Sequence, residues 1–364
     1  MEECRHRSQL YSLKRAIERK QLTIGFIGGS ITDARPRHNW PEPVIAWFAE
    51  CYPDVRLFVE NAAIGATGSE LGVFRAERDL IRRDCDLVFV EFAVNDQDMK
   101  PDARMRSREG LLRKLLADGK RDIVLTYTYS QAMYADMQEG RVPPSIADFE
   151  KLADHYRLGS VWMGLHAWNE VCKGRMSWEE WLPDGLHPTH RGSLSYAQSV
   201  IAFLERELEG AHASLGDEPQ QPLLPEAYHP ANWASAYALD FAQVELEGPW
   251  TIRRWPHLVW MDQVLHTSAV GARLAFSFQG RGLLLGFDFG KASAEFRYRL
   301  DGGPWELSER ERPDWCGDQG WYRVSPIADD LPPGGHRFEL EVIHGNRPDC
   351  RGTHLALALI GVIE

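Results

Sequence analysis

Up to about residue 210, short apolar runs alternate with segments of helical periodicity. The apolar runs predict buried strands, and the periodic segments predict helices with one apolar face. The predicted strands are Thr23–Ile27, Val55–Val59, Asp86–Phe92, Asp122–Tyr127 and Ser160–Leu165. The predicted helices are Leu10–Lys20, Val44–Phe48, Leu111–Leu116, Ile146–Tyr156 and Leu194–Leu208. Nearly continuous apolar strands that alternate with helices indicate a parallel sheet covered on both faces.

The pattern changes beyond residue 215. The segment Gly216–Pro222 is polar and contains two prolines, which is typical of a linker. After it, apolar and polar residues alternate in short runs separated by glycine-rich turns, which predicts an antiparallel β-sandwich. The predicted strands there are Leu274–Phe278, Leu283–Phe287, Ala294–Leu300, His336–Val342 and Leu355–Ile363. We therefore expect an α/β domain over residues 1–215, a linker over 216–224 and an all-β domain over 225–364.

Four polar segments of the first domain follow predicted strands or precede its last helix. They are Gly28–Thr32, Asn61–Gly68, Ala93–Asp96 and Asp184–Pro188. In an open parallel sheet, ligands bind beyond the carboxyl ends of the strands. We therefore expect these segments to converge at one edge of the sheet.

Ser30, His187 and Asp184 supply the residue types that acyl transfer requires. A serine hydroxyl becomes a good nucleophile only when a nearby base takes its proton, and a histidine can act as that base near neutral pH. A carboxylate must then hold the imidazole in the right tautomer. Because Asp184 lies three residues before His187, a tight turn can bring the two side chains together.

The tetrahedral intermediate of acyl transfer carries an oxyanion, which needs preorganised hydrogen-bond donors. The candidate donors are the backbone N–H of Ser30, a backbone N–H at Gly65 or Ala66, and the side-chain amide of Asn95. Each of these residues has an ordinary structural interpretation when taken singly, such as a helix cap or a turn. Their joint placement favours a catalytic site.

Over about residues 20–210, the four segments resemble, in order, the four motif blocks of the SGNH/GDSL hydrolase superfamily. Ser30 matches the serine of the G-D-S block, although Gly29 stands where that family usually has aspartate. Asn95 matches the asparagine of the G-x-N-D block, with Ala93 in place of glycine. The resemblance implies a flavodoxin-like α/β/α domain that works as a serine esterase.

The other two blocks also match. Asp184 and His187 fit the D-x-x-H block. In the glycine block, counting from Asn61 puts the donor position on Ala66, whereas the nearest glycine is Gly65. Either residue offers a backbone N–H, so the sequence leaves the identity of this donor open.

The all-β domain resembles the jelly-roll modules attached to some carbohydrate esterases, which implies an acetyl group on a sugar as substrate. Such a module could bind glycan, shape the mouth of the active site or form an oligomer interface. Two other functions stay open: an acyltransferase on the same scaffold, and a glycan-binding protein without activity. No G-x-S-x-G elbow, phosphate-binding loop or metal-ligand spacing is present, so we expect neither a cofactor nor a metal.

Several other residues have weaker interpretations. The tryptophans and tyrosines before Asp184 favour core packing over a substrate pocket, with Trp181 and Tyr129 as the candidates for substrate contact. Asp96 is expected to be a turn or cap residue. The arginines between residues 75 and 83 are expected to form a solvated, salt-bridged face with their acidic neighbours; they are Arg75, Arg78, Arg82 and Arg83.

The net charge of the chain restricts the classes of partner that it is expected to bind. The 364 residues carry a formal net charge of −12, which disfavours nucleic acid and anionic membranes. No apolar run approaches the roughly 20 residues that span a bilayer, and the polar start of the chain leads us to expect a cytoplasmic protein. The six cysteines form no CxxC pair, so we expect free thiols. The expected partner is a small ester or acetylated sugar, and a homo-oligomer is possible.

Overall fold

The computed structural model describes residues 2–33, 39–209, 224–308, 312–316, 320–348 and 350–364. The chain forms two compact units, Met1–Ala234 and Ser235–Glu364. The first contains a sheet covered by helices, and the second consists of antiparallel sheets, so the predicted fold class is confirmed. Most of the predicted linker lies outside the described residues.

The first unit is built on a six-stranded sheet with the order β1-β6-β5-β4-β2-β3. All neighbours are parallel except β1, which pairs antiparallel with β6. The parallel strands follow the flavodoxin-like order, in which the winding of the chain reverses between β2 and β4. The strands are β1 (Cys4–Arg5), β2 (Gln21–Gly28), β3 (Arg56–Asn61), β4 (Leu87–Glu91), β5 (Asp122–Thr126) and β6 (Gly159–Val161).

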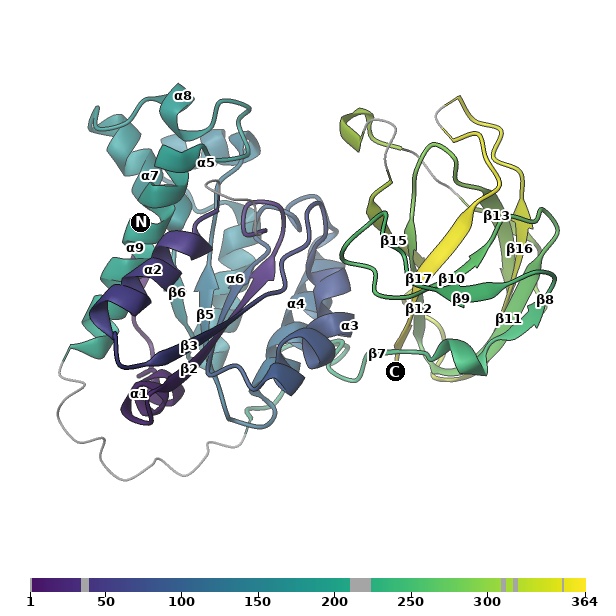
Figure 1. Ribbon diagram of the computed structural model, residues 1–364, viewed down its shortest axis with the longest axis horizontal. Helices are drawn as coiled ribbons and strands as arrows, with labels where there is room; N and C mark the ends of the chain where they lie inside the picture. Colours follow the sequence, from purple (N-terminus) through teal and green to yellow (C-terminus); the bar gives the residue numbers. More distant parts are fainter. Residues whose placement is uncertain (1, 34–38, 210–223, 309–311, 317–319, 349) are drawn as a thin grey trace. The chain divides into compact units, whose positions relative to one another are not determined.

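Helices cover both faces of this sheet (Figure 1). In one group α2 and α7 pack on α9, and in the other α3 and α6 pack on α4. Three helices begin at a proline, where the missing N–H needs no partner. The helices are α1 (Tyr11–Glu18), α2 (Pro41–Cys51), α3 (Ser69–Asp79), α4 (Pro101–Leu116), α5 (Tyr134–Gln138), α6 (Pro144–Tyr156), α7 (Met163–Cys172), α8 (Trp178–Trp181) and α9 (His190–Leu208).

The predicted strand at Ser160–Leu165 is wrong beyond Val161. Strand β6 ends there, and Met163 begins the helix α7. Met163 and Leu165 are nevertheless buried. A short apolar run is compatible with a buried strand or a buried helix, so periodicity alone could not separate the two.

An aromatic core supports the carboxyl half of β2. The rings of Phe26 on β2 and Phe89 on β4 stack with centroids 5.2 Å apart, and Trp40 meets both edge-on. All three side chains are fully buried. The Trp40 indole N–H also donates to the Thr32 hydroxyl at 3.0 Å, which ties this core to the turn that follows β2.

The second unit is a sandwich of two antiparallel sheets around an apolar core. One sheet has the order β15-β12-β17-β10-β9, with β7 pairing to β17, and the other has the order β14-β13-β16-β11-β8. The strands are β7 (Tyr237–Ala238), β8 (Glu245–Glu247), β9 (Thr251–Arg253), β10 (Val264–Thr267), β11 (Arg273–Gly280), β12 (Gly282–Asp288), β13 (Glu295–Leu300), β14 (Glu306–Leu307), β15 (Tyr322–Ala328), β16 (Gly334–Ile343) and β17 (Leu355–Ile363).

Residues 225–234, assigned from the sequence to the second domain, pack on the first unit. The buried Glu109 carboxylate of α4 accepts hydrogen bonds from the backbone N–H groups of Tyr228 and His229 at 2.5 and 2.7 Å. Trp233 is buried against Gly110. A Cβ added to Gly110 would lie 2.5 Å from the backbone carbonyl carbon of Trp233. The division between the units therefore falls about ten residues later than the sequence predicted.

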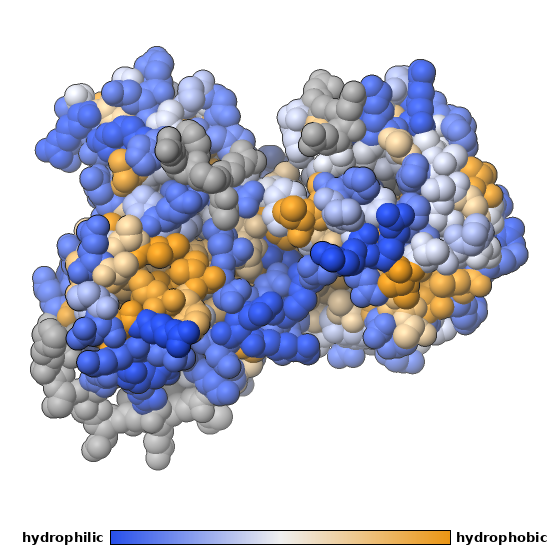
Figure 2. All heavy atoms as spheres, in the orientation of Figure 1, coloured by the Kyte–Doolittle hydropathy of each residue, from blue (hydrophilic) through white to orange (hydrophobic). Residues whose placement is uncertain are grey.

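Strand β3 forms the outer edge of the sheet. Apolar surface gathers over this region in Figure 2, and the β3 side chains Phe58 and Val59 are exposed. Among the helices in the described ranges, none is long and apolar enough to cross a membrane.

Candidate active site

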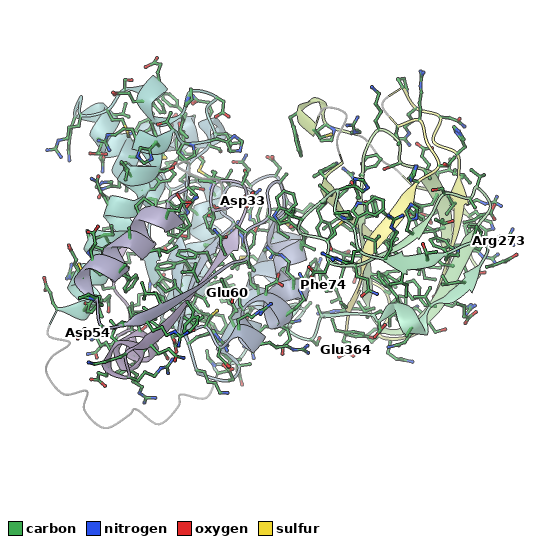
Figure 3. All side chains as sticks on the ribbon, in the orientation of Figure 1. Asp33, Asp54, Glu60, Phe74, Arg273 and Glu364 are labelled. Carbon is green, nitrogen blue, oxygen red and sulfur yellow. The ribbon has the colours of Figure 1, made fainter. Side chains whose placement is uncertain are left out.

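The predicted segments converge at the carboxyl edge of the sheet. Ser30 follows β2 and Asn95 follows β4, which are the neighbouring strands at which the winding reverses. A crevice at this point is the usual ligand position in such sheets. In Figure 3, Asp33 lies at this carboxyl edge, whereas Asp54, which precedes β3, lies at the opposite edge.

Ser30, His187 and Asp184 form a hydrogen-bonded relay. The Ser30 hydroxyl lies 2.9 Å from His187 Nε2, and His187 Nδ1 lies 2.8 Å from Asp184 Oδ2. Ser30 is half-buried, whereas the Asp184 side chain is 54% exposed. The imidazole can therefore accept the serine proton on one side while the carboxylate holds it on the other.

The turn between Asp184 and His187 is built by the aspartate itself. Its Oδ1 accepts the backbone N–H groups of Leu186 and His187 at 2.9 and 2.7 Å. Partial burial would raise the pKa of Asp184, but these hydrogen bonds and the one from the His187 ring lower it below its usual value. Gly185 adopts φ +77°, and its carbonyl accepts the Gln131 N–H at 2.9 Å, which fixes the turn against the segment after β5.

Asn95 lies directly against the serine turn. A Cβ added to Gly29 would stand 2.5 Å from Asn95 Cγ and 2.7 Å from Nδ2, so a side chain at residue 29 would require the Asn95 amide to move. The absence of a side chain at Gly29 therefore leaves room for the Asn95 amide beside Ser30.

The segment after β3 is fastened to the same turn. Asn61 Nδ2 donates to the Thr32 carbonyl at 3.0 Å, while its Oδ1 accepts the Ala63 N–H at 3.0 Å. Ala66 adopts the left-handed conformation with φ +58°, which is the conformation that favours glycine. Gly65 has no positive φ. In this segment Ala66, and not Gly65, therefore has the backbone conformation in which glycine is usually found.

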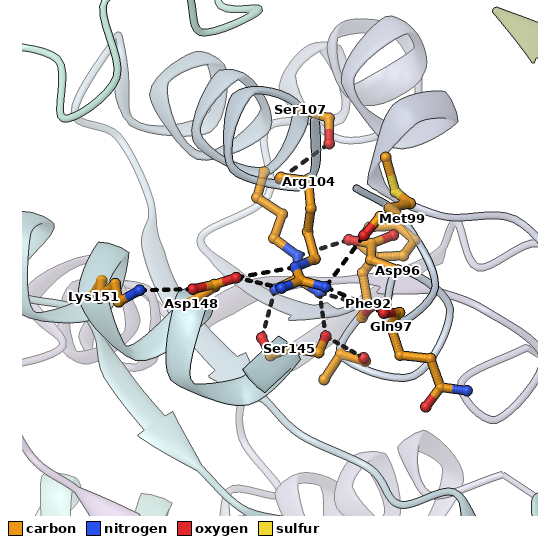
Figure 4. A network of polar contacts seen from close by, with 11 residues as sticks. Phe92, Asp96, Gln97, Met99, Arg104, Ser107, Ser145, Asp148 and Lys151 are labelled. Carbon is orange, nitrogen blue, oxygen red and sulfur yellow. Dashed lines mark hydrogen bonds and ion pairs between the residues drawn. The ribbon is translucent and has the colours of Figure 1, made fainter. Parts of the chain in front are cut away.

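A buried ion pair between Asp96 and Arg108 anchors the segment that contains Asn95 (Figure 4). Asp96 and Arg108 are both fully buried, and the guanidinium Nε donates to Asp96 Oδ2 at 2.7 Å. Asp96 Oδ1 accepts the Ser69 N–H at 2.9 Å, so Asp96 also caps α3, as the sequence predicted. Arg108 further donates to Ser145 Oγ at 2.7 Å. Sequence inspection missed Arg108, because nothing in a helical run marks one arginine as buried.

Arg75 departs from its predicted setting. Its ion pair with Asp79 exists at 3.0 Å, but the Arg75 side chain is buried rather than solvated. The guanidinium also donates to the Ala62 carbonyl at the start of the segment that contains Ala66. The predicted salt bridging with acidic neighbours therefore holds for Arg75, but its predicted exposure to solvent is wrong.

Trp181 and Tyr129, the candidates for substrate contact, are fully buried and pack with ring centroids 4.8 Å apart. Trp168, Trp178 and Tyr134 surround them and are half-buried. A substrate role for Trp181 or Tyr129 stays a prediction. Within the described ranges, no group of three His, Cys, Asp or Glu side chains converges on a possible metal position.

No family profile matches the sequence, and the search of curated proteins found no match. Among solved structures, the chain is similar to a two-domain esterase, CEX, active on acetylated mannans and co-crystallised with mannopentaose. The identity is 22%, the TM-score is 0.82, and the match covers 99% of this chain and 96% of that chain. A structure of the same esterase described without mannopentaose gives equal values.

A shorter match is to Axe2, an acetylxylan esterase from Geobacillus stearothermophilus. It shares 23% identity over 51% of this chain and 94% of that chain, with a TM-score of 0.39. The match to CEX, in contrast, extends over both units, so the complete two-domain fold occurs in a known protein.

Proposed function

We propose that this chain is a serine esterase of the SGNH/GDSL type that removes acetyl groups from a sugar or oligosaccharide. The observation that carries the proposal is the relay in which Ser30 Oγ lies 2.9 Å from His187 Nε2 and Asp184 lies 2.8 Å from Nδ1. These distances are within the range that a nucleophile, its base and the group that orients the base require.

The cycle has two halves. Ser30 Oγ attacks the ester carbonyl carbon while His187 takes the hydroxyl proton, and Asp184 stabilises the imidazolium. The sugar alcohol then leaves with that proton, and the acetyl group stays on Ser30. Water attacks the acetyl-enzyme with His187 again as base, which releases acetate and restores the serine.

The oxyanion of each tetrahedral intermediate needs donors that are already in place. The Ser30 and Ala66 N–H groups and the Asn95 amide are the proposed donors. The left-handed backbone of Ala66 favours this residue over Gly65, since strained backbone is found preferentially at functional sites. The position of the Asn95 side chain beside the turn that carries Ser30 is the observation behind the proposed role of the amide.

The acetylated-sugar substrate follows from two observations. The fold matches that of an esterase active on acetylated mannans over nearly the whole chain. The formal net charge of −12 disfavours anionic substrates and leaves a neutral sugar ester as a good fit. Neither observation selects one sugar.

The test compares wild type with Ser30→Ala on p-nitrophenyl acetate, acetylated mannan, acetylated xylan and a longer p-nitrophenyl ester. We expect the wild type to release acetate from at least one acetylated glycan and Ser30→Ala to be inactive while folded. Retained turnover in Ser30→Ala would contradict the proposal. Transfer of the acetyl group to an added sugar rather than to water would instead identify an acyltransferase.

A fluorophosphonate probe separates the third possibility, a glycan-binding protein without activity. Such probes react with serines that a neighbouring base activates. We expect the wild type to be labelled at Ser30, whereas an inert binding protein would leave Ser30 unlabelled.

A further inference from the structure

A carboxylate lies buried behind the serine turn. Glu91 is the last residue of β4 and is fully buried. Its two oxygens accept the hydroxyls of Thr32 and Thr128 at 3.1 and 2.8 Å, and the Gly29 N–H is a third donor. The donors come from the segments after β2 and β5, on either side of β4. One side chain therefore connects the ends of three adjacent strands.

The connection reaches the nucleophile through the backbone. Gly29 immediately precedes Ser30, and its carbonyl accepts the N–H groups of Thr32 and Asp33 at 3.2 and 3.0 Å. Glu91 therefore holds the N–H of the residue that starts this turn and the hydroxyl of the residue that ends it. The ends of β2 and β4 also pack closely here, since a Cβ on Gly28 would stand 2.8 Å from the backbone carbonyl oxygen of Glu91.

We infer that Glu91 is a positioning residue of this site, whose ionised carboxylate fixes the turn that aims Ser30 at His187. This inference rests on the proposed function. An ionised carboxylate is an acceptor only and can accept all three donors at once. When it is protonated, one oxygen carries a hydrogen and must itself find an acceptor, so one of the three bonds is lost or reversed.

The carboxyl group of Glu91 ionises within the pH range over which turnover is measured. Burial raises the pKa of Glu91 to about 7, despite the opposing effect of the hydrogen bonds from Thr128, Thr32 and Gly29. The other titratable groups that act on it are Asp96, whose charge raises the pKa further, and the buried Tyr196 of α9. The Asp96 charge is paired with Arg108. Glu91 must then be deprotonated for full activity.

The test is the pH dependence of Glu91→Gln. Glutamine has nearly the same shape and represents the protonated carboxyl. Small displacements of catalytic groups reduce rates strongly, so we expect kcat on p-nitrophenyl acetate to fall by about tenfold to a hundredfold near pH 8. KM should stay within about threefold, because Glu91 does not reach the substrate.

The slope of log kcat against pH gives the more specific result. On the acid side it should be steeper in wild type than in Glu91→Gln by up to one unit, because the variant lacks the ionisation of Glu91. The control is Glu60→Gln, the same chemical change near the end of the edge strand β3, which should leave kcat and slope unchanged. Wild-type kcat in Glu91→Gln, or a lowered kcat with an unchanged slope, would overturn the inference.

A second variant covers the case in which Glu91→Gln does not fold. Thr128→Val removes one donor and leaves the charge. Losing a donor to the ionised form raises the pKa of a carboxyl, so kcat should fall and the acid limb should move to higher pH. An unchanged profile would overturn the inference. If Ser30→Ala is inactive while both variants match wild type, only the role of Glu91 fails; if Ser30→Ala is active, the proposed function fails.

Discussion

Asn95 fills the space beside Gly29 that a side chain at residue 29 would occupy. An added Cβ would stand 2.5 Å from the Asn95 Cγ atom. The two residues come from different strand ends, so glycine at one position and asparagine at the other form a single structural unit. If the amide is an oxyanion donor, a side chain at residue 29 should displace it from that position.

Gly29→Ala should therefore reproduce the loss caused by Asn95→Ala. Removal of one oxyanion donor costs about 2.7–4 kcal/mol of transition-state stabilisation, or about 10²–10³ in kcat. Since both substitutions remove the same interaction, the double variant should be no slower than Asn95→Ala alone. Steady-state kinetics of the three variants measure this. A loss below about threefold in Asn95→Ala would exclude the amide from this role, and additive losses would separate the two residues.

Ala66→Gly should make the protein more stable without loss of activity. A non-glycine residue in the left-handed conformation costs about 1–2 kcal/mol, and the greater freedom of glycine in the unfolded chain offsets part of this. We expect a gain of about 1 kcal/mol in the free energy of unfolding, measured by denaturant titration. A loss of stability would show that the methyl group makes contacts that outweigh the strain.

Asp184→Asn should slow turnover by about 10³–10⁴-fold, because an amide cannot hold the imidazole in the productive tautomer. It should also change the stability at low pH. The lowered pKa of Asp184 means that its ionised form stabilises the fold above the usual value of 3.8, and this contribution disappears as the pH falls through the lowered pKa. Unfolding of Asp184→Asn should thus depend less on pH in the acid range. Equal kcat in variant and wild type would remove Asp184 from the relay.

Glu91 should make the fold less stable as the pH rises. Its pKa is raised from 4.5 to about 7, so its stabilising contribution is complete below 4.5 and is lost as the pH rises through 7. The shift corresponds to about 3 kcal/mol. The stability of Glu91→Gln relative to wild type should therefore increase by about this amount between pH 4 and pH 8. Parallel stability curves in urea unfolding would show that the pKa of Glu91 is the same in the folded and the unfolded chain.

Much of the site could be predicted because parallel strands place their carboxyl ends at one edge. Ser30 and Asn95 each follow an apolar run, and Asp184 is close to His187 in the chain, so order and spacing were enough. The local patterns do not give the strand order, and the role of Glu91 becomes visible only when β4 is known to lie between β2 and β5. An acidic residue at the end of a wholly buried strand was the signal that could have been noticed.

The remaining differences have the same origin. Arg75 and Arg108 lie in helical runs, and the sequence does not show that their side chains are buried in ion pairs with Asp79 and Asp96. Residues 225–234 follow a polar linker and were assigned to the second domain, yet Glu109 holds them on α4. In each case the outcome depends on which surfaces meet in the folded chain, and local patterns do not contain that information.

The most direct test is to trap the acetyl-enzyme. Wild type mixed with p-nitrophenyl acetate and quenched in acid within one turnover should carry one acetyl group on the peptide that contains Ser30, as found by mass spectrometry after digestion. Ser30→Ala treated in the same way should carry none. Acetylation at another residue, or turnover by Ser30→Ala at the wild-type rate, would contradict the account.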